Sequence, residues 1–253
     1  MQIKKGYKTE KLSLDHSIVI SKILKSITNN NWEFLLSELP SGSVLVGGYI
    51  RDLILNRLSS FPDIDIVVPD NALNVGRNIA SKFSGKFLIL DPQRNIVRII
   101  FKEFIVDIAN QTNNSLIEDL KERDLTINSI CFCFDSRKLI DPANGVYDLN
   151  NSLLRCFKYE NLIHDPLRIL RCFRFVSELN FCIQQNLLEF IEFNKSLLRN
   201  VAAERIQYEL KKIVSGEEAL KAILYINKLK IFDWIQSYEK NPSQFLLLMN
   251  YED

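Results

Sequence analysis

Short apolar runs rich in Val, Ile and Phe alternate with longer amphipathic segments between positions 44 and 140 of this sequence. Apolar runs bounded by Gly, Pro, Asn or Asp are typical of strands, whereas apolar residues three or four apart are typical of helices. The pattern predicts helices at Tyr49–Leu58, Asn71–Phe83 and Ser115–Leu120. It predicts strands at Val44–Val46, Ile64–Val68, Phe87–Leu90, Ile96–Phe101, Phe104–Ile108, Ile130–Phe134 and Leu139–Ile140.

The pattern on both sides of this region is helical. Before it, the apolar residues of 18–27 lie near helical spacing until the asparagines at 29–31 break the pattern. We therefore expect a mixed α/β domain at residues 1–153, with a helical lead-in at 1–40, and an all-helical part at 154–253. Helices are predicted in the second part at Pro166–Leu179, Gln184–Phe193, Ala202–Val214 and Glu217–Lys228.

The composition excludes several classes of protein. Of the 253 residues, 47% are hydrophobic and 25% charged, with 8 Gly and 7 Pro, so a disordered, collagen-like or low-complexity chain is excluded. No run of about 18 apolar residues is present, so no membrane span is expected. The first residues contain lysines without a following apolar segment, which is not the pattern of a secretory signal. The five cysteines have no disulfide or zinc spacing, so we expect reduced thiols and a cytoplasmic protein.

The first group of chemically informative residues is an apolar strand that runs into Gly47 and Gly48 and then into a helix. Two glycines let the backbone approach a ligand, and a helix N-terminus offers free N–H groups to an anion such as phosphate. Arg51, one turn into the helix, can add a charge-assisted contact to the same anion. The alternative is an ordinary turn, which the glycines alone do not exclude.

Two acidic residues, Asp63 and Asp65, begin the next strand. Residues two apart on a strand point to the same face, so the two carboxylates lie side by side and repel each other unless a cation binds between them. Carboxylate oxygens are ligands that Mg²⁺ prefers, so this pair predicts a magnesium site. The alternative is a solvated pair at a loop edge after Pro62. Asp107, at the end of another predicted strand, can reach the same place or can be a surface strand end.

These residues and several later blocks resemble a known family. Gly47-Gly48-x-x-Arg51-Asp52 followed by Asp63-x-Asp65 is similar to the first motif of the polymerase β-like nucleotidyltransferases. The match resembles more closely the class II tRNA nucleotidyltransferases and bacterial poly(A) polymerases. Further blocks follow in the family's order, up to about residue 214. They are Glu122–Ile130, similar to an Arg-Arg-Asp motif, then Asp141–Leu149, then Asp165–Phe175, similar to the nucleotide-recognition motif, and Ala203–Leu210.

The resemblance implies a polymerase β-like α/β head followed by a helical neck and body, and a template-independent RNA nucleotidyltransferase activity. Such an enzyme adds C or A to the 3′ end of tRNA from CTP or ATP, and releases pyrophosphate by two-metal phosphoryl transfer. Asp63 and Asp65 are then the Mg²⁺ ligands, with Asp107 as a third catalytic acid. The implied nucleotide-binding residues are Gly47, Gly48 and Arg51 at the triphosphate, Arg123 at the phosphates, Asp124 at the ribose, Asn128, and Asp165, Arg168 and Arg171.

Asp165 and Arg168 are three residues apart and, by the resemblance, pair with the incoming base. The carboxylate accepts from an exocyclic amine and the guanidinium donates to the adjacent ring nitrogen, an edge that cytosine and adenine present and uracil and guanine do not. A wrong base leaves polar groups unpaired, at a cost of about 1–3 kcal/mol. Without the resemblance, the two residues would be an ordinary helix ion pair, and Arg123, Asp124 and Asn128 an ordinary polar cluster.

Two positions depart from the family pattern. His164 stands where relatives have Glu, which weakens the positioning of Arg168, and Glu122 replaces the first Arg of the Arg-Arg-Asp motif. The whole chain has a net charge of only +1, but residues 151–230 contain 13 Lys and Arg against 9 Asp and Glu. This local surplus suits RNA, although a solvated helix face is the alternative for each residue alone.

The interval between Asp107 and Arg123 predicts which nucleotides are added. CCA-adding relatives have there a charged, flexible loop that helps the site switch from CTP to ATP, whereas Asn110–Ser115 is uncharged and short. We therefore expect addition of CC, with the terminal A left to a partner enzyme. The chain is also shorter than full-length relatives, so we expect a minimal family member or a grip on tRNA supplied by another subunit, in a homo-oligomer or with a partner. The alternatives are a poly(A) polymerase and a non-catalytic RNA- or nucleotide-binding module.

Overall fold

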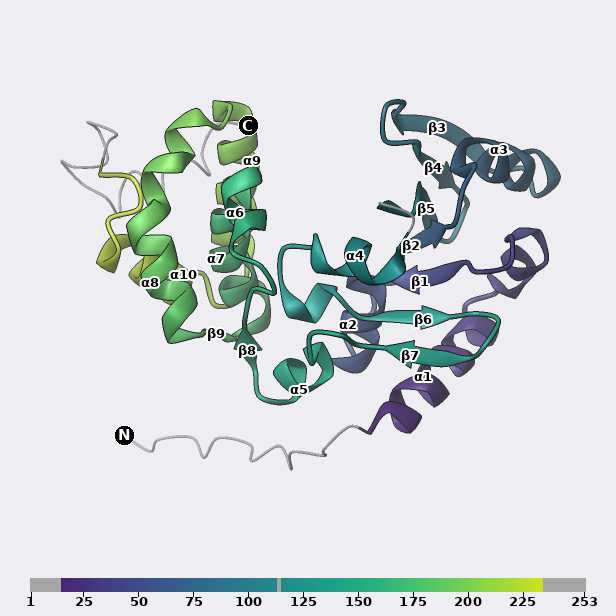
Figure 1. Ribbon diagram of the computed structural model, residues 1–253, viewed down its shortest axis with the longest axis horizontal. Coiled ribbons are helices and arrows are strands. Elements are labelled where there is room, and N and C mark those ends of the chain that lie inside the picture. Colours follow the sequence, from purple (N-terminus) through teal and green to yellow (C-terminus); the bar gives the residue numbers. More distant parts are fainter. Residues whose placement is uncertain (1–14, 113–114, 234–253) are drawn as a thin grey trace.

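A computed structural model describes residues 15–112 and 115–233 of the chain (Figure 1). The predicted order of an α/β head followed by a helical part is confirmed. The head contains a seven-stranded mixed sheet with the strand order β3-β4-β5-β2-β1-β6-β7. The strands are β1 Val44–Val46, β2 Asp63–Val68, β3 Lys86–Asp91, β4 Ile96–Ile100, β5 Ile105–Asn110, β6 Cys131–Cys133 and β7 Lys138–Ile140.

The register of the central strands determines which side chains share a face. β2 and β5 are parallel, with Asp65 opposite Asp107, and β4 is antiparallel to β5, with Arg98 opposite Asp107. Because side chains alternate along a strand, these residues and Asp63 lie on one face of the sheet. The opposite face of β2 and β5 is buried in the hydrophobic core, as the full burial of Ile64 shows. The polar residues therefore lie on the face opposite this core, where Leu120 of the helix Leu116–Lys121 packs against the neighbouring Val44, Val46 and Val67.

Helices and short 3₁₀ segments cover the other face and the ends of the sheet. Buried Trp32 and Ser26 contact the hydroxyl of Tyr49 by hydrogen bonds, which joins the first helix to the second. The second helix is shorter than predicted, because Asn56 adopts a left-handed conformation with a φ of 55° just after its end. The elements are α1 His16–Asn29, η1 Glu33–Glu38, α2 Gly48–Ile54, α3 Ala72–Lys82, α4 Leu116–Lys121, η3 Thr126–Asn128 and α5 Gly145–Asn150.

The second part of the chain is helical and lies beside the head, drawn in green to yellow in Figure 1. The sequence pattern did not predict α5 or α6, which have 6 and 5 residues and are too short for a clear period. An addition to the predicted layout is a small parallel pair, β8 Leu153–Leu154 with β9 Cys182–Ile183. The helices are α6 Glu160–His164, α7 Leu167–Leu179, α8 Gln185–Asn194, η4 Lys195–Asn200, α9 Ala203–Ser215 and α10 Ala219–Lys228.

One continuous hydrophobic core joins the two parts. Ile64 of the sheet, Leu154 at the junction and Phe173 of α7 are fully buried members of the same cluster. The predicted lead-in at 1–40 and the second part at 154–253 extend over residues 1–14 and 234–253, which lie outside the described residues. Over the described part of the chain, no helix combines the length and apolar character needed to cross a membrane.

Candidate functional site

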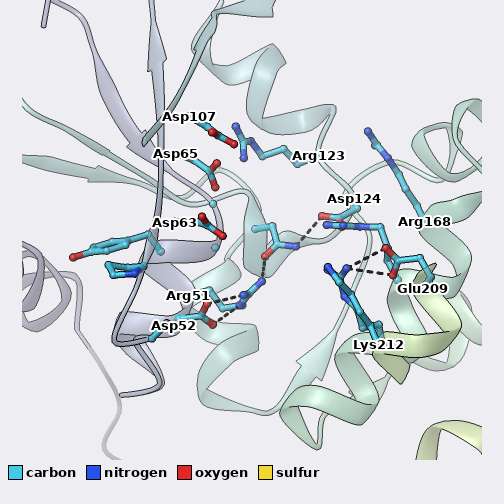
Figure 2. A pocket seen from close by; sticks show the side chains of 18 of the residues that line it. Arg51, Asp52, Asp63, Asp65, Asp107, Arg123, Asp124, Arg168, Glu209 and Lys212 are labelled. Atoms are coloured by element: carbon cyan, nitrogen blue, oxygen red, sulfur yellow. Dashed lines mark hydrogen bonds and ion pairs between the residues drawn. The ribbon is translucent and has the colours of Figure 1, made fainter. Parts of the chain in front are cut away.

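A cavity of about 680 Å³ lies between the polar face of the sheet and the helices α7 and α9. Figure 2 shows Asp63, Asp65 and Asp107 on one side of it and Arg168, Glu209 and Lys212 on the other. The cavity brings together every residue that the sequence predicted for the site. These are Gly47, Gly48, Arg51, Asp63, Asp65, Asp107, Arg123, Asp124, Asn128, Asp165, Arg168 and Arg171.

The turn between β1 and α2 lines this cavity through Gly47 and Gly48. Gly47 has a φ of 75° and a ψ of −134°, a conformation that residues with a side chain rarely adopt. A Cβ atom on Gly47 would lie 3.0 Å from Nη1 of Arg123 and 3.3 Å from Oδ2 of Asp65. The glycine therefore lets the backbone turn sharply while an arginine and an acid approach it closely.

The three acids differ in their surroundings. Asp63, the first residue of β2, is exposed, and Asp65 is partly buried. Asp107 accepts two hydrogen bonds from Arg98, at 2.7 Å from Nε to Oδ1 and 2.7 Å from Nη2 to Oδ2. This bidentate pair raises the pKa of the Arg98 guanidinium and holds the Asp107 carboxylate in a fixed orientation.

The charged form of Asp65 is disfavoured by its surroundings, and a bound cation would stabilise it. Burial, together with the negative charges of Asp107 and Asp63, raises the pKa of Asp65 to about 6, although Arg123 and Arg51 oppose the shift. The neutral form is therefore favoured more than for an ordinary aspartate. A divalent cation near Asp63 and Asp65 would stabilise both carboxylates in their charged form.

The acids fit a metal as a pair rather than as a triad. Within residues 15–112 and 115–233, no three His, Cys, Asp or Glu side chains are close enough together to hold a metal ion. Asp107 is engaged with Arg98, which leaves Asp63 and Asp65 as the pair with available oxygens. Two carboxylates on one strand face, open to a cavity, match the oxygen ligands and the remaining water positions that Mg²⁺ takes in proteins.

A continuous polar network connects α2 to α7. Arg51 binds Asp52 through two hydrogen bonds of 2.8 Å and donates a third, also 2.8 Å, to Oδ1 of Asn128. The amide of Asn128 donates to Asp124 at 2.9 Å, and Arg171 donates to the other Asp124 oxygen at 2.7 Å. Figure 2 marks the contacts of Arg51 and the contact of Asp124 with the neighbouring amide as dashed lines. The network therefore fixes the two walls of the cavity relative to each other.

Asp124 is a buried anion in this network. Burial alone would raise its pKa, but the charge of Arg171 and the hydrogen bonds from Asn128, Arg171 and the Leu125 N–H outweigh burial. They hold the pKa of Asp124 at about 2, so the residue is a carboxylate throughout the physiological range. Both of its oxygens accept hydrogen bonds inside the protein.

Arg123 reaches toward the Gly47 turn and Asp65. Its Nη2 lies 3.4 Å from Oδ2 of Asp119, which orients the side chain from α4. Its Nε is buried and, among the residues that the structure describes, has no hydrogen-bond partner. An unpaired buried donor on a cation that lines a cavity suits an anionic ligand.

Asp165 and Arg168 lie at the junction of α6 and α7. Asp165 caps the end of α6 in an extended conformation, and α7 begins at Leu167, so the two residues do not share one helix as the spacing suggested. Nε of Arg168 lies 4.0 Å from Oδ2 of Asp165, and both side chains remain about one-third exposed, at 27% and 35%. Both residues line the same cavity as the Gly47 turn.

The structure adds site residues that sequence reasoning did not assign. Arg98 comes from β4, and its presence opposite Asp107 depends on strand pairing that no local pattern reveals. Glu209 is buried on α9 and accepts two hydrogen bonds from Arg174 of α7, at 3.1 and 3.2 Å. The guanidinium carbons of Arg51, Arg171 and Arg174 lie 5.0, 5.6 and 4.8 Å from the centre of the Phe175 ring. Phe175 is buried in the core, and its ring also supports the arginines of the cavity.

Comparison with protein families identifies two regions of the chain. Residues 43–155 match the poly A polymerase head domain. Residues 180–238 match the probable RNA and SrmB-binding site of polymerase A. The first match includes β1, the acids of β2 and β5, and the block around Asp124, and the second includes α9. The two matches fall on the two parts of the fold and on both walls of the cavity.

Individual relatives and solved structures agree with these family matches. A CC-adding tRNA nucleotidyltransferase from Synechocystis sp. is 37% identical over 191 residues, 76% of this chain and 46% of the relative. An A-adding tRNA nucleotidyltransferase from Deinococcus radiodurans is 32% identical over 203 residues, 78% of this chain and 46% of the relative. The chain thus spans about half the length of the curated relatives that it matches.

The solved structures show the same fold. A CCA-adding enzyme in complex with CTP superposes with a TM-score of 0.75 at 25% identity, over 84% of this chain and 53% of that one. The Thermotoga maritima CCA-adding enzyme complexed with tRNA superposes with a TM-score of 0.72 at 27% identity, over 86% and 54%. The predicted polymerase β-like head with a helical neck is confirmed. The chain belongs to the family of tRNA nucleotidyltransferases and poly(A) polymerases.

Proposed function

We propose that this chain adds nucleotides to the 3′ end of tRNA, taking them from CTP or ATP and releasing pyrophosphate. The observation that supports this most is that the acidic face of β2 and β5 lines the same cavity as Asp165 and Arg168. One side of that cavity suits phosphate chemistry and the other suits recognition of a base. CC-adding and A-adding enzymes among the relatives, and relatives solved with CTP and with tRNA, support the same reaction.

The Gly47–Gly48 turn would hold the triphosphate. Backbone N–H groups at the start of α2, the guanidinium of Arg51 and the unpaired Nε of Arg123 supply donors and positive charge around it. Asp63 and Asp65 would hold a divalent cation, which we propose to be Mg²⁺. When bound, such a cation neutralises phosphate charge and favours ionisation of the attacking 3′-hydroxyl. Asp107, oriented by Arg98, would lie beside that hydroxyl.

Asp165 and Arg168 would select the base. A carboxylate accepts from the amino group of cytosine or adenine, and a guanidinium donates to the neighbouring ring nitrogen. Uracil and guanine present a carbonyl oxygen to the carboxylate instead. Selection of C and A thus follows from the side chains themselves, without a nucleic acid template.

We further propose that the enzyme adds CC and stops, leaving the terminal A to a partner enzyme. β5 ends at Asn110 and α4 begins at Leu116, so few residues separate the third acid from the helix that positions Arg123. Of this interval, residues 113–114 lie outside the described part. A short connection gives little reach for reorienting the base-selecting pair from CTP to ATP.

A cytoplasmic location is proposed as well, since tRNA is the proposed substrate and the five cysteines are free thiols.

The test is incubation with tRNA that lacks its 3′ CCA, using each labelled NTP separately. Incorporation of label from CTP, with none from UTP or GTP, is the expected result. Incorporation from ATP only into tRNA that already ends in CC would identify an A-adding enzyme instead. Long A tails on unrelated RNA would identify a poly(A) polymerase, and no incorporation of any nucleotide would overturn the proposed activity.

A further inference from the structure

The carboxylate of Asp165 has a partner outside its own motif. Nη2 of Arg205, on α9, lies 3.2 Å from Oδ1 and 3.2 Å from Oδ2 of Asp165. Arg168, three residues along the chain, is farther away, at 4.0 Å from the nearer oxygen. The cation closest to the base-selecting carboxylate is therefore 40 residues distant in sequence.

Arg168 is held by a different group. Its Nη1 donates to the backbone carbonyl of Glu122 at 2.6 Å, and Glu122 directly follows α4. A carboxylate and a guanidinium three residues apart would otherwise close into a direct ion pair. Such a pair would occupy the oxygen and the N–H groups that a base must contact. Arg205 and the Glu122 carbonyl thus act as two separate anchors, and the ion pair between Asp165 and Arg168 stays long, at 4.0 Å.

We propose that Arg205 is a positioning residue that sets base choice, because it fixes the Asp165 carboxylate in the orientation that accepts from a nucleobase amine. The proposal rests on the proposed function, in which Asp165 and Arg168 select the base. The Asp side chain rotates easily about its last torsion, so an external contact is needed to fix which lone pairs face the cavity. Contact through a single Nη2 uses one side of the carboxylate and leaves lone pairs on the other side for the base.

The solvent exposure of Arg205 and Asp165 distinguishes a positioning role of Arg205 from a role in folding stability. The side chain of Arg205 is 54% exposed and that of Asp165 is 35% exposed. Ion pairs this open to solvent contribute little to folding stability. Removal of Arg205 should therefore leave the fold intact and change the selection of nucleotides.

The experiment compares CTP with UTP in Arg205→Ala, Arg205→Lys and wild type. Equilibrium binding of each nucleotide and kcat/KM for addition to tRNA lacking its 3′ CCA are both measured. We expect the CTP preference of Arg205→Ala to fall by about tenfold, because Asp165 then closes onto Arg168. Arg205→Lys should keep most of the preference, since an ammonium can contact the same oxygens. In an Asp165→Ala background, Arg205→Ala should cause no further loss.

Two controls separate the explanations. Arg199→Ala removes an exposed arginine from the same part of the chain and should leave the CTP preference unchanged. If Arg205 only contacts RNA phosphates, Arg205→Ala raises KM for tRNA equally with every nucleotide and keeps the preference, which would overturn the proposal. A wild type that binds CTP and UTP equally would overturn it too. A wild type that binds CTP preferentially but extends no RNA would overturn the proposed function, while the loss of binding preference in Arg205→Ala would still support the role of Arg205.

Discussion

Among single residues of the site, two aspartates, Asp65 and Asp124, have opposite environments. Asp65 is partly buried near like charges, and its pKa is raised to about 6, whereas Asp124 is buried among hydrogen-bond donors, and its pKa is lowered to about 2. Residue type alone does not distinguish them. Their neighbours differ, and on that ground we propose a cation at Asp65, whereas Asp124 belongs to the internal network.

Replacing either acid of β2 should abolish nucleotide addition without unfolding the protein. We expect Asp63→Asn and Asp65→Asn to lower kcat by at least about a thousandfold, since each removes an oxygen ligand of the proposed cation. Glu103→Gln makes the same chemical change at an exposed position outside the cavity and is the control. Measurement of labelled CTP addition, with circular dichroism as the check of folding, decides. Addition by either β2 variant at the rate of the control would exclude the metal assignment.

Asp124 should make folding stability depend on pH. Its pKa is lower in the folded protein than the ordinary value of 3.8, so its contribution is present above about pH 4 and is lost as the pH falls toward 2. The shift corresponds to about 2 kcal/mol. Denaturant titrations of wild type and Asp124→Asn should therefore differ most at pH 7 and converge near pH 2. A difference that is constant between pH 2 and pH 7 would show that the carboxylate charge is not responsible.

At the scale of elements, the turn between β1 and α2 should tolerate change at one glycine and not at the other. A Cβ on Gly48 would meet Arg51 at 3.5 Å, an ordinary contact, whereas one on Gly47 would lie 3.0 Å from Arg123 in a left-handed backbone. Gly47→Ala must shift the turn, so we expect KM for CTP to rise by about tenfold or more, following a strain of ~1–2 kcal/mol. Gly48→Ala should change KM much less. Equal effects in steady-state kinetics of the two variants would argue against a binding role for this turn.

The contact between α7 and α9 depends on a buried ion pair. The side chains of Arg174 and Glu209 are 9% and 4% exposed. Glu209→Leu leaves a buried guanidinium without this partner and should lower the free energy of unfolding by about 3 kcal/mol. The double variant Arg174→Met/Glu209→Leu removes both charges and should be more stable than Glu209→Leu alone. Thermal or denaturant unfolding measures this, and a double variant that is less stable than the single one would contradict the explanation.

The sequence pattern predicted the features of the site that depend on residues close together along the chain. Asp63 and Asp65 lie two apart on one strand, so their shared face followed from alternation, and the glycine turn followed from Gly47 itself. The spacing of Asp165 and Arg168 suggested a pair on one helix, but Asp165 is extended at the junction of α6 and α7, because Pro166 disfavours helical backbone at the residue before it. The apolar runs were enough to predict the strands. The end of a helix depends instead on residues in a left-handed conformation, such as Asn56.

At the scale of the whole molecule, the site requires both parts of the chain, and long-range pairing was beyond the sequence pattern. Arg98 faces Asp107 through β4–β5 pairing, and Arg205 faces Asp165 through the packing of α9 beside α7. Neither contact has a local pattern, since each joins residues from separate elements. The network from Arg51 to Arg171 likewise connects the head to the helical part. A family resemblance identified the motifs, but only the fold shows which side chains hold them in place.

The length of the product shows whether this enzyme adds CC to tRNA and stops. A tRNA that ends at the residue before CCA is incubated with the protein, Mg²⁺ and CTP and ATP together, and the product is resolved on a sequencing gel. We expect extension by two nucleotides, both C, with the same product when ATP is omitted. A product three nucleotides longer that ends in A would contradict the limit to CC, and an unextended tRNA would contradict the proposed function itself.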